Sequence, residues 1–112
     1  MKTMAYIRVS TIEQDLKNQR YEILQYADKE NIKVTEWMEI KISSRKSTKE
    51  RLIALMENLN DGDTLIVSEL SRLGRSVGQI AIMASTLVDT GVRLISIKEN
   101  MKLDGTPDNN FV

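Results

Sequence analysis

The 112-residue chain is 41% hydrophobic and 29% charged, the composition of one ordinary folded domain, and its sixteen basic and sixteen acidic residues cancel. Cysteine and histidine are both absent, which excludes disulfide bonds, thiolate metal sites and the commonest general base of enzymes. No apolar run approaches the roughly 18 residues of a membrane span and no signal peptide opens the chain, so we expect a cytoplasmic protein.

The first part of the chain alternates apolar runs with an amphipathic segment. Residues 3–9 are apolar and β-branched, which predicts a strand. Residues 11–30 carry apolar side chains at helical spacing, and the sequence from Ser10 to Glu13 is typical of a capping box, so we expect a helix there. Residues 32–38 indicate a second strand, and the polar, basic stretch 39–46 indicates a loop.

The second part of the chain continues this alternation. A capping box opens a predicted helix over residues 47–59, and residues 64–67 read as a short buried strand. We expect a further helix over 71–90, a strand over 92–97 and a loop over 100–110. Both helices should face the core with apolar residues at helical spacing, which are Leu52, Leu55, Met56, Leu59, Ile80, Met83, Ala84 and Leu87.

The order of these elements predicts the fold class. Strands that alternate with helices form an α/β fold with a mostly parallel central sheet, here of about four strands, and helices on both faces. In such sheets the functional site lies outside the carboxyl ends of the strands. The residues that follow the first and third strands are therefore the first candidates for chemistry.

Arg8 and Ser10 stand at the carboxyl end of the first strand. Side chains alternate along a strand, so Tyr6 and Arg8 share one face, and Ser10 joins them if the strand continues. A guanidinium, a hydroxyl and a helix N-terminus together suit a phosphate. The residues alone leave a second interpretation open, in which Ser10 only caps the helix and Arg8 faces solvent at the sheet edge.

The segment Ser71-Arg72-Leu73-Gly74-Arg75-Ser76 follows the third strand. On a helix Arg72 and Arg75 would be neighbours on one face, where two like charges repel unless they share an anion. Gly74 weakens a helix and could allow a close approach. The alternative is a solvated helix face with ordinary surface arginines. Residues 41–51 contain five basic residues and Glu50, and this charged stretch can likewise be interpreted as ordinary solvated surface.

The two arginine-bearing segments occur together in a pattern that resembles the serine recombinases, the resolvase/invertase family. The sequence Tyr6-Ile7-Arg8-Val9-Ser10-Thr11, followed by Gln14 and Gln19, is similar to the opening motif of that family, and the segment 71–76 is similar to its second motif. The resemblance covers essentially the whole chain. It implies a resolvase-like fold in which residues 1–112 form the catalytic domain.

The resemblance also implies a role for each matching residue. Ser10 matches the nucleophile that attacks a DNA phosphodiester and forms a 5′-phosphoserine link. Arg8, Arg72 and Arg75 match the arginines that bind the scissile phosphate, and Gln19 matches a supporting polar residue. The family needs no metal and no cofactor, because the covalent link conserves the bond energy. The implied partners are DNA and further copies of the chain, as a homodimer and as a homotetramer in the synaptic complex, without a membrane or a small-molecule substrate.

Two residues and the chain length depart from the family pattern. Ser71 stands where the family commonly has aspartate, and Lys49 stands where it usually has arginine, with Arg45 and Arg51 as alternatives. Family members continue into a long dimer helix and, in small resolvases and invertases, a C-terminal DNA-binding domain, and we expect neither within these residues. We count Lys49, Ser71 and Tyr6, together with Gln19, as supporting or DNA phosphate-binding residues.

The function implied by the resemblance is site-specific DNA recombination by phosphoryl transfer. The alternative is a non-catalytic regulatory or oligomerisation domain of the same fold, inactive because Ser71 replaces the acidic residue. A more distant alternative, a flavodoxin-like binder of a small ligand, rests on fold analogy alone and leaves the three arginines unexplained.

Overall fold

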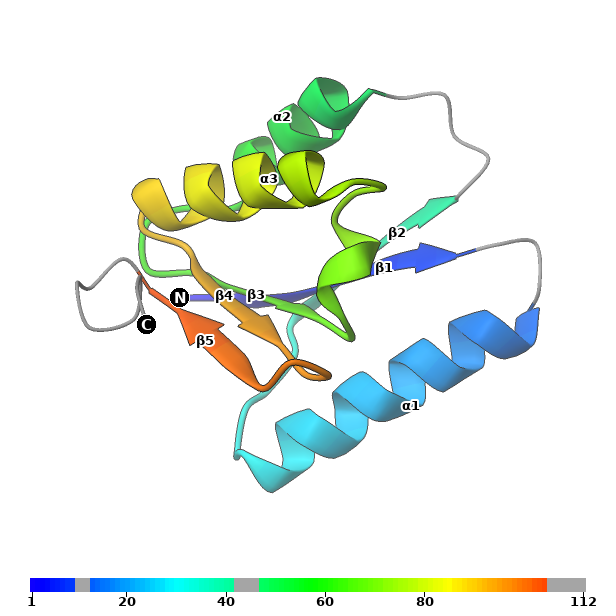
Figure 1. The fold of residues 1–112 in the computed structure, drawn as a ribbon. Helices are drawn as coiled ribbons and strands as arrows, with labels where there is room; N and C mark the ends of the chain where they lie inside the picture. The colour runs from blue at the N-terminus through cyan, green and yellow to red at the C-terminus, as the bar shows by residue number, and fades with distance from the viewer. Residues whose placement is uncertain (10–12, 42–46, 105–112) are drawn as a thin grey trace.

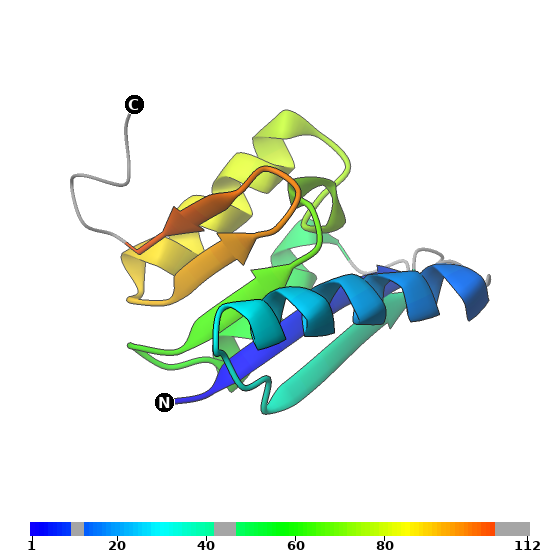
Figure 2. The same ribbon diagram turned by 90° about the horizontal axis from the view of Figure 1, so that it is seen from below.

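The computed structural model describes residues 1–9, 13–41 and 47–104 of the chain. A five-stranded sheet in the order β2-β1-β3-β4-β5 forms its centre, with α1 on one face and α2 and α3 on the other (Figure 1). Figure 2 shows α1 lying across its face of the sheet. The strands are β1 (Thr3–Val9), β2 (Glu36–Lys41), β3 (Thr64–Val67), β4 (Arg93–Ser96) and β5 (Met101–Leu103). The helices are α1 (Glu13–Lys29), α2 (Thr48–Asn58), the 3-10 turn η1 (Leu70–Arg72) and α3 (Val77–Asp89).

The sheet is mostly parallel, as the alternation of elements predicts. β1 pairs in parallel with both β2 and β3, β3 pairs in parallel with β4, and β5 runs antiparallel to β4. In the part of the chain that the structure describes, no helix is long and apolar enough to cross a membrane. The predicted α/β fold with a mostly parallel sheet and helices on both faces is confirmed.

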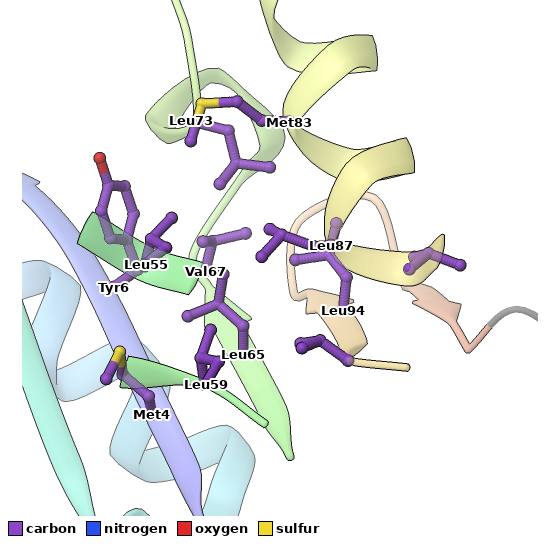
Figure 3. Close-up of a cluster of buried hydrophobic side chains, with 12 residues drawn as sticks. Met4, Tyr6, Leu55, Leu59, Leu65, Val67, Leu73, Met83, Leu87 and Leu94 are labelled. Carbon is purple, nitrogen blue, oxygen red and sulfur yellow. The ribbon is translucent and has the colours of Figure 1, made fainter. Parts of the chain in front are cut away.

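The central strand β1 separates two apolar cores by simple alternation of its side chains. Met4 and Tyr6 point toward α2 and α3, whereas Ala5, Ile7 and Val9 point toward α1. Figure 3 shows the larger core, in which Tyr6 lies beside a leucine of α2. That core comprises Met4, Tyr6, Leu55, Leu59, Leu65, Val67, Leu73, Met83, Leu87, Val88, Val92 and Leu94.

The second predicted strand is shifted along the chain. Ile32 and Val34, which suggested a strand from residue 32, pack against the core under α1 before the strand begins. β2 starts at Glu36 and continues to Lys41, through residues expected in a loop. An edge strand pairs on one side only, so β2 accepts charged side chains while its backbone pairs with β1. Residues 42–46, the rest of that predicted loop, lie outside the described residues.

Two further expectations were wrong. The stretch expected to be a loop after residue 100 contains β5, which pairs Leu103 with Leu94 of β4 after a turn in which Asn100 adopts a positive φ of 55°. The helix expected over 71–90 is divided into η1, a turn and α3. A Cβ at Gly74 would lie 2.8 Å from the Cβ of Gln79, so glycine allows this turn to fold against the start of α3.

The capping box predicted at the start of α2 is present. The Ser47 hydroxyl accepts the backbone N–H of Glu50 at 3.1 Å, and the Ser47 backbone N–H donates to the Glu50 carboxylate at 3.3 Å. This reciprocal pair fixes where α2 begins, and therefore which of its residues face the sheet. The capping box predicted from Ser10 to Glu13 falls largely outside the described residues.

Candidate functional site

The segments that leave β1 and β3 meet at the carboxyl edge of the sheet. The two strands are parallel neighbours, so their ends point the same way, and β1 contacts η1 directly. Arg8 is the last residue but one of β1, and η1 follows β3 after Ser68 and Glu69. This edge brings the first predicted site segment next to the second, as expected for a parallel sheet.

Arg8 lies on the face of β1 that also carries Tyr6, and its side chain is half-buried. Its Nε and Nη1 atoms are buried and have no hydrogen-bond partner. Burial lowers the pKa of Arg8, and the nearby charges of Arg51, Arg72 and Arg75 lower it further. Three further guanidiniums thus lie close enough to act on Arg8, and an anion bound among them would offset this unfavourable interaction.

Tyr6 and Arg51 are the buried residues next to Arg8. Tyr6 is fully buried, its hydroxyl has no hydrogen-bond partner, and in Figure 3 that hydroxyl points away from Met4. Burial raises the pKa of Tyr6, and the charges of Arg51 and Arg8 partly oppose that rise. Arg51 is only 6% exposed and stands one helical turn before Leu55, which packs beside Tyr6.

Arg72 and Arg75 reach the edge from a turn. Arg72 ends η1, and its Nη2 lies 3.6 Å from Oδ1 of Asp15 in α1, while its buried Nε has no hydrogen-bond partner. Arg75 is exposed, and its backbone N–H donates to the side chain of Gln79 at 2.8 Å. The predicted pairing of the two arginines on one helix face is wrong, because the turn at Gly74 separates them, but both charges still act on Arg8.

Gln19 connects three elements at this edge. It is buried in α1, and its Nε2 donates to the backbone carbonyl of Arg8 at 3.0 Å and to Oδ2 of Asp15 at 3.1 Å. Asp15 also pairs with Arg72, so one amide and one carboxylate link α1 to β1 and η1. The Oε1 atom of Gln19 is buried without a hydrogen-bond partner. These contacts join Gln19 to the backbone of Arg8 and, through Asp15, to the side chain of Arg72.

Ser71 stands beside a carboxylate, although it is not acidic itself. Its hydroxyl donates a hydrogen bond to the carboxylate of Glu69, whose other oxygen lies 3.7 Å from Nζ of Lys98. This hydrogen bond lowers the pKa of Glu69, and the charges of Arg72 and Lys98 lower it further. The segment therefore carries a negative charge two residues before Ser71.

The remaining sequence candidates are less closely placed. Ser10 directly follows the last residue of β1 in the sequence but lies outside the described residues. Lys49 is exposed in the first turn of α2, whereas Arg51 of the same helix is buried and its charge acts on Arg8. Sequence reasoning named Arg51 only as an alternative. The signal that could have found it is its spacing, four and eight residues before the apolar Leu55 and Leu59.

Comparison with known proteins gives matches along nearly the whole chain. Residues 3–112 match the family described as the resolvase N-terminal domain. The chain is 34% identical over 109 residues to a resolvase of Clostridium perfringens, which covers 96% of this chain and 54% of that protein. It is 36% identical over 101 residues to the DNA-invertase hin of Salmonella typhimurium, covering 90% of this chain and 50% of that protein. The chain thus spans about half the length of these curated relatives.

Two solved structures share the fold. The N-terminal catalytic domain of TP901-1 integrase superposes with a TM-score of 0.73 at 24% sequence identity, over 97% of this chain and 85% of that chain. A resolvase family site-specific recombinase from Streptococcus pneumoniae superposes with a TM-score of 0.65 at 22% identity, over 91% of this chain and 75% of that chain. The overall fold described above is therefore that of resolvase-like catalytic domains.

Proposed function

Because the chain belongs to the resolvase/invertase family of serine recombinases, we propose that it is the catalytic domain of an enzyme of site-specific DNA recombination. The observation that carries this proposal is the cluster of four guanidiniums at the carboxyl edge of the sheet, where Arg8 and Arg72 bury N–H groups that have no hydrogen-bond partner. A phosphodiester is an anion of the size and geometry that such forks bind.

In the proposed reaction Ser10 is the nucleophile. Its oxygen attacks the phosphorus of a DNA phosphodiester, a serine–phosphate bond forms, and the bond from phosphorus to the 3′ oxygen breaks. The serine proton leaves to an acceptor in the site or substrate, and the departing 3′ oxygen takes up a proton and becomes a free hydroxyl. After strand exchange a 3′-hydroxyl attacks the 5′-phosphoserine, which restores both the phosphodiester and Ser10. One phosphodiester is consumed and one is formed, so the reaction needs no external energy source.

The arginines act on charge in this reaction. Attack on phosphorus places additional negative charge on the phosphate oxygens, and Arg8, Arg72 and Arg75 are the groups that we propose to bind these oxygens. The buried donors of Arg8 and Arg72 are in place before the substrate arrives, so little reorganisation is needed in the transition state. Tyr6, Gln19 and Ser71 are the proposed supporting residues. Of these, Gln19 donates to the backbone carbonyl of Arg8, Ser71 donates to Glu69, and the charge of Arg8 acts on Tyr6.

Residues 1–112 supply the catalytic part of the proposed function. The chain spans about half the length of its relatives. We propose that a region corresponding to the other half of those proteins carries out dimer formation, assembly of the synaptic tetramer and recognition of a DNA site. Among the residues described, the helices all pack on the sheet and none is free to enter a DNA groove. Binding of DNA by this chain alone should accordingly be weak, independent of sequence and steeply dependent on salt.

The test is capture of the covalent intermediate. A longer chain that joins this domain to the dimerisation and DNA-binding region of a resolvase relative is incubated with a supercoiled substrate, and protein-linked DNA is counted on a denaturing gel. Ser10→Ala and Ser10→Asp should both eliminate the adduct, although aspartate caps a helix as well as serine does. Thr11→Ala, which removes the neighbouring hydroxyl, is the matched control and should retain it. An adduct that persists in Ser10→Ala would show that another group is the nucleophile.

A further inference from the structure

We propose that Arg51, and not Lys49, is the basic residue that α2 contributes to the phosphate-binding cluster. The inference rests on the proposed function of this edge as a phosphate site, and it concerns which side chain of α2 the phosphate meets. The resemblance to the family pointed to Lys49 from sequence position alone. The structure separates the two residues by helix face, burial and neighbours.

Helix geometry places the two side chains on opposite sides of α2. Residues two apart on an α-helix are rotated by about 200° from each other, whereas residues four apart share a face. Arg51 shares its face with Leu55 and Leu59, which are 0% and 5% exposed and pack in the core around Tyr6. Lys49 is exposed to solvent. The capping pair at Ser47 fixes the start of the helix and therefore this assignment of faces.

Arg51 is an unusual residue for the face that it occupies. Among the residues that the structure describes, Arg51 and Asp63 are the two buried side chains that carry a charge, at 6% and 4% exposed. Asp63 accepts two backbone N–H groups, from Lys2 and Asn60, which account for its buried charge. The charge of Arg51 adds to that of Arg8 at the carboxyl edge of the sheet. An anion held between Arg51 and the half-buried Arg8 would lower the cost of keeping these like charges close together.

The chemistry of the two side chains agrees with this placement. The planar guanidinium of Arg51 can hold two phosphate oxygens at once, whereas the ammonium of Lys49 is a single point of charge. Arg8, Arg72 and Arg75 approach the cluster from β1, η1 and the turn before α3, and Arg51 adds the side of α2. The expected ligand is one phosphate group bounded by guanidiniums from four separate segments.

The experiment measures binding of inorganic phosphate to the 112-residue chain, by titration calorimetry and by the rise in unfolding temperature, at constant ionic strength with chloride as the balancing anion. Arg51→Met should lower the phosphate affinity about 10- to 100-fold, because it removes charge-assisted hydrogen bonds. The ligand-free unfolding temperature of each variant is measured alongside, so that a loss of phosphate affinity is told apart from a loss of stability. Lys49→Met, and the matched control Lys17→Met on α1, should each change the affinity by about twofold or less.

Arg51→Lys provides a second measurement that does not depend on Arg51→Met folding. It keeps the charge, loses the planar fork, and should retain phosphate binding about 3- to 10-fold weaker than wild type. An unchanged affinity in both Arg51 variants, a larger loss in Lys49→Met, or no phosphate binding by the wild type would each overturn the inference. The adduct experiment answers a different question. If phosphate binding depends on Arg51 but Ser10 forms no adduct, the proposed recombinase activity is wrong and the anion site remains.

Discussion

The two ends of the parallel sheet hold buried charge in different ways. At the amino end, Asp63 accepts the backbone N–H of Lys2 at 3.0 Å and that of Asn60 at 2.8 Å, so its charge is satisfied within the protein. At the carboxyl end, Arg8 buries two nitrogen atoms that have no hydrogen-bond partner, and other guanidiniums surround it. The buried charge at the amino end is stabilised by hydrogen bonds within the protein, whereas the carboxyl end carries N–H donors that can bind an external anion.

The pKa shifts at the two ends have the same direction and opposite meanings. Hydrogen bonds from Asn60 and Lys2 lower the pKa of Asp63, which means that folding favours its charged form. Burial and neighbouring positive charges lower the pKa of Arg8, which means that folding disfavours its charged form. Folding therefore gains free energy from the charge on Asp63 and loses free energy to the charge on Arg8. A loss of this kind is typical of functional sites.

The largest expected effect comes from removing the charge of Arg8. In the longer chain used for the adduct experiment, Arg8→Met should lower the rate of DNA cleavage by about 10²- to 10³-fold, the usual cost of one donor to a developing anion. Its unfolding free energy should stay equal to that of the wild type or rise, because a disfavoured charge leaves the sheet edge. Single-turnover cleavage and chemical denaturation of the same preparations check both parts. A marked loss of stability would mean that Arg8 holds the fold together instead.

The converse change at the amino end is Asp63→Asn. The amide has one oxygen where the carboxylate uses two, so one backbone N–H loses its acceptor, and the unfolding free energy should fall by about 1–3 kcal/mol. Phosphate affinity should not change, because Asp63 lies at the opposite end of the strands from the arginines. Urea denaturation and phosphate titration measure the two quantities. A loss of phosphate binding in a folded Asp63→Asn protein would contradict the division between the two ends.

The pH dependence of stability sharpens the same comparison. Since the folded-state pKa of Asp63 lies below its unfolded value of about 3.9, its contribution is complete above that value and is lost as pH falls through the folded pKa. The difference in unfolding free energy between wild type and Asp63→Asn should therefore be constant from about pH 7 to pH 5 and should shrink below about pH 4. Denaturation curves for both proteins at several pH values provide the measurement. A difference that persists unchanged to the lowest pH would mean that the charge of Asp63 is not the cause.

The fold was accessible from the sequence wherever local patterns and burial agree. The apolar run of β1 and the capping box at Ser47 gave the right elements, because hydrophobic periodicity and capping are local signals. The start of β2 and the existence of β5 could not be read in this way. Pairing across the sheet decides both, and it holds Lys41 opposite Val9 and Leu103 opposite Leu94 whatever their local propensity.

The candidate site was accessible in its residue types and less so in its geometry. The order of strands and helices correctly places Arg8 and Arg72 at one edge, because parallel strands end together. The turn at Gly74 and the burial of Arg51 depend on contacts with α3 and with the core. In the helical pattern of the sequence, Arg51 is a charged residue on an otherwise apolar face. The three-dimensional structure is needed to show that its charge lies near that of Arg8.

The smallest expected effect comes from a group at the carboxyl end that is already satisfied. Glu99, in the turn between β4 and β5, accepts the backbone N–H of Leu70 at 3.1 Å and the hydroxyl of Ser96, and so holds η1 against the sheet. In Glu99→Gln the amide oxygen still accepts these bonds, so the unfolding free energy should fall by about 1 kcal/mol or less.

The phosphate affinity of Glu99→Gln should change by less than about threefold, because the substitution preserves the position of Arg72 and touches none of the donors. Glu99→Ala, which leaves the Leu70 N–H without its acceptor, should be the less stable of the two and should bind phosphate more weakly as η1 loosens. Denaturation and phosphate titration of both variants distinguish residues that support the structure of the site from residues that bind the phosphate. If Glu99→Gln alone raised the phosphate affinity tenfold or more, the negative charge of Glu99 would be acting on the anion. A group that is already hydrogen-bonded within the protein would then also influence phosphate binding, contrary to the comparison drawn here.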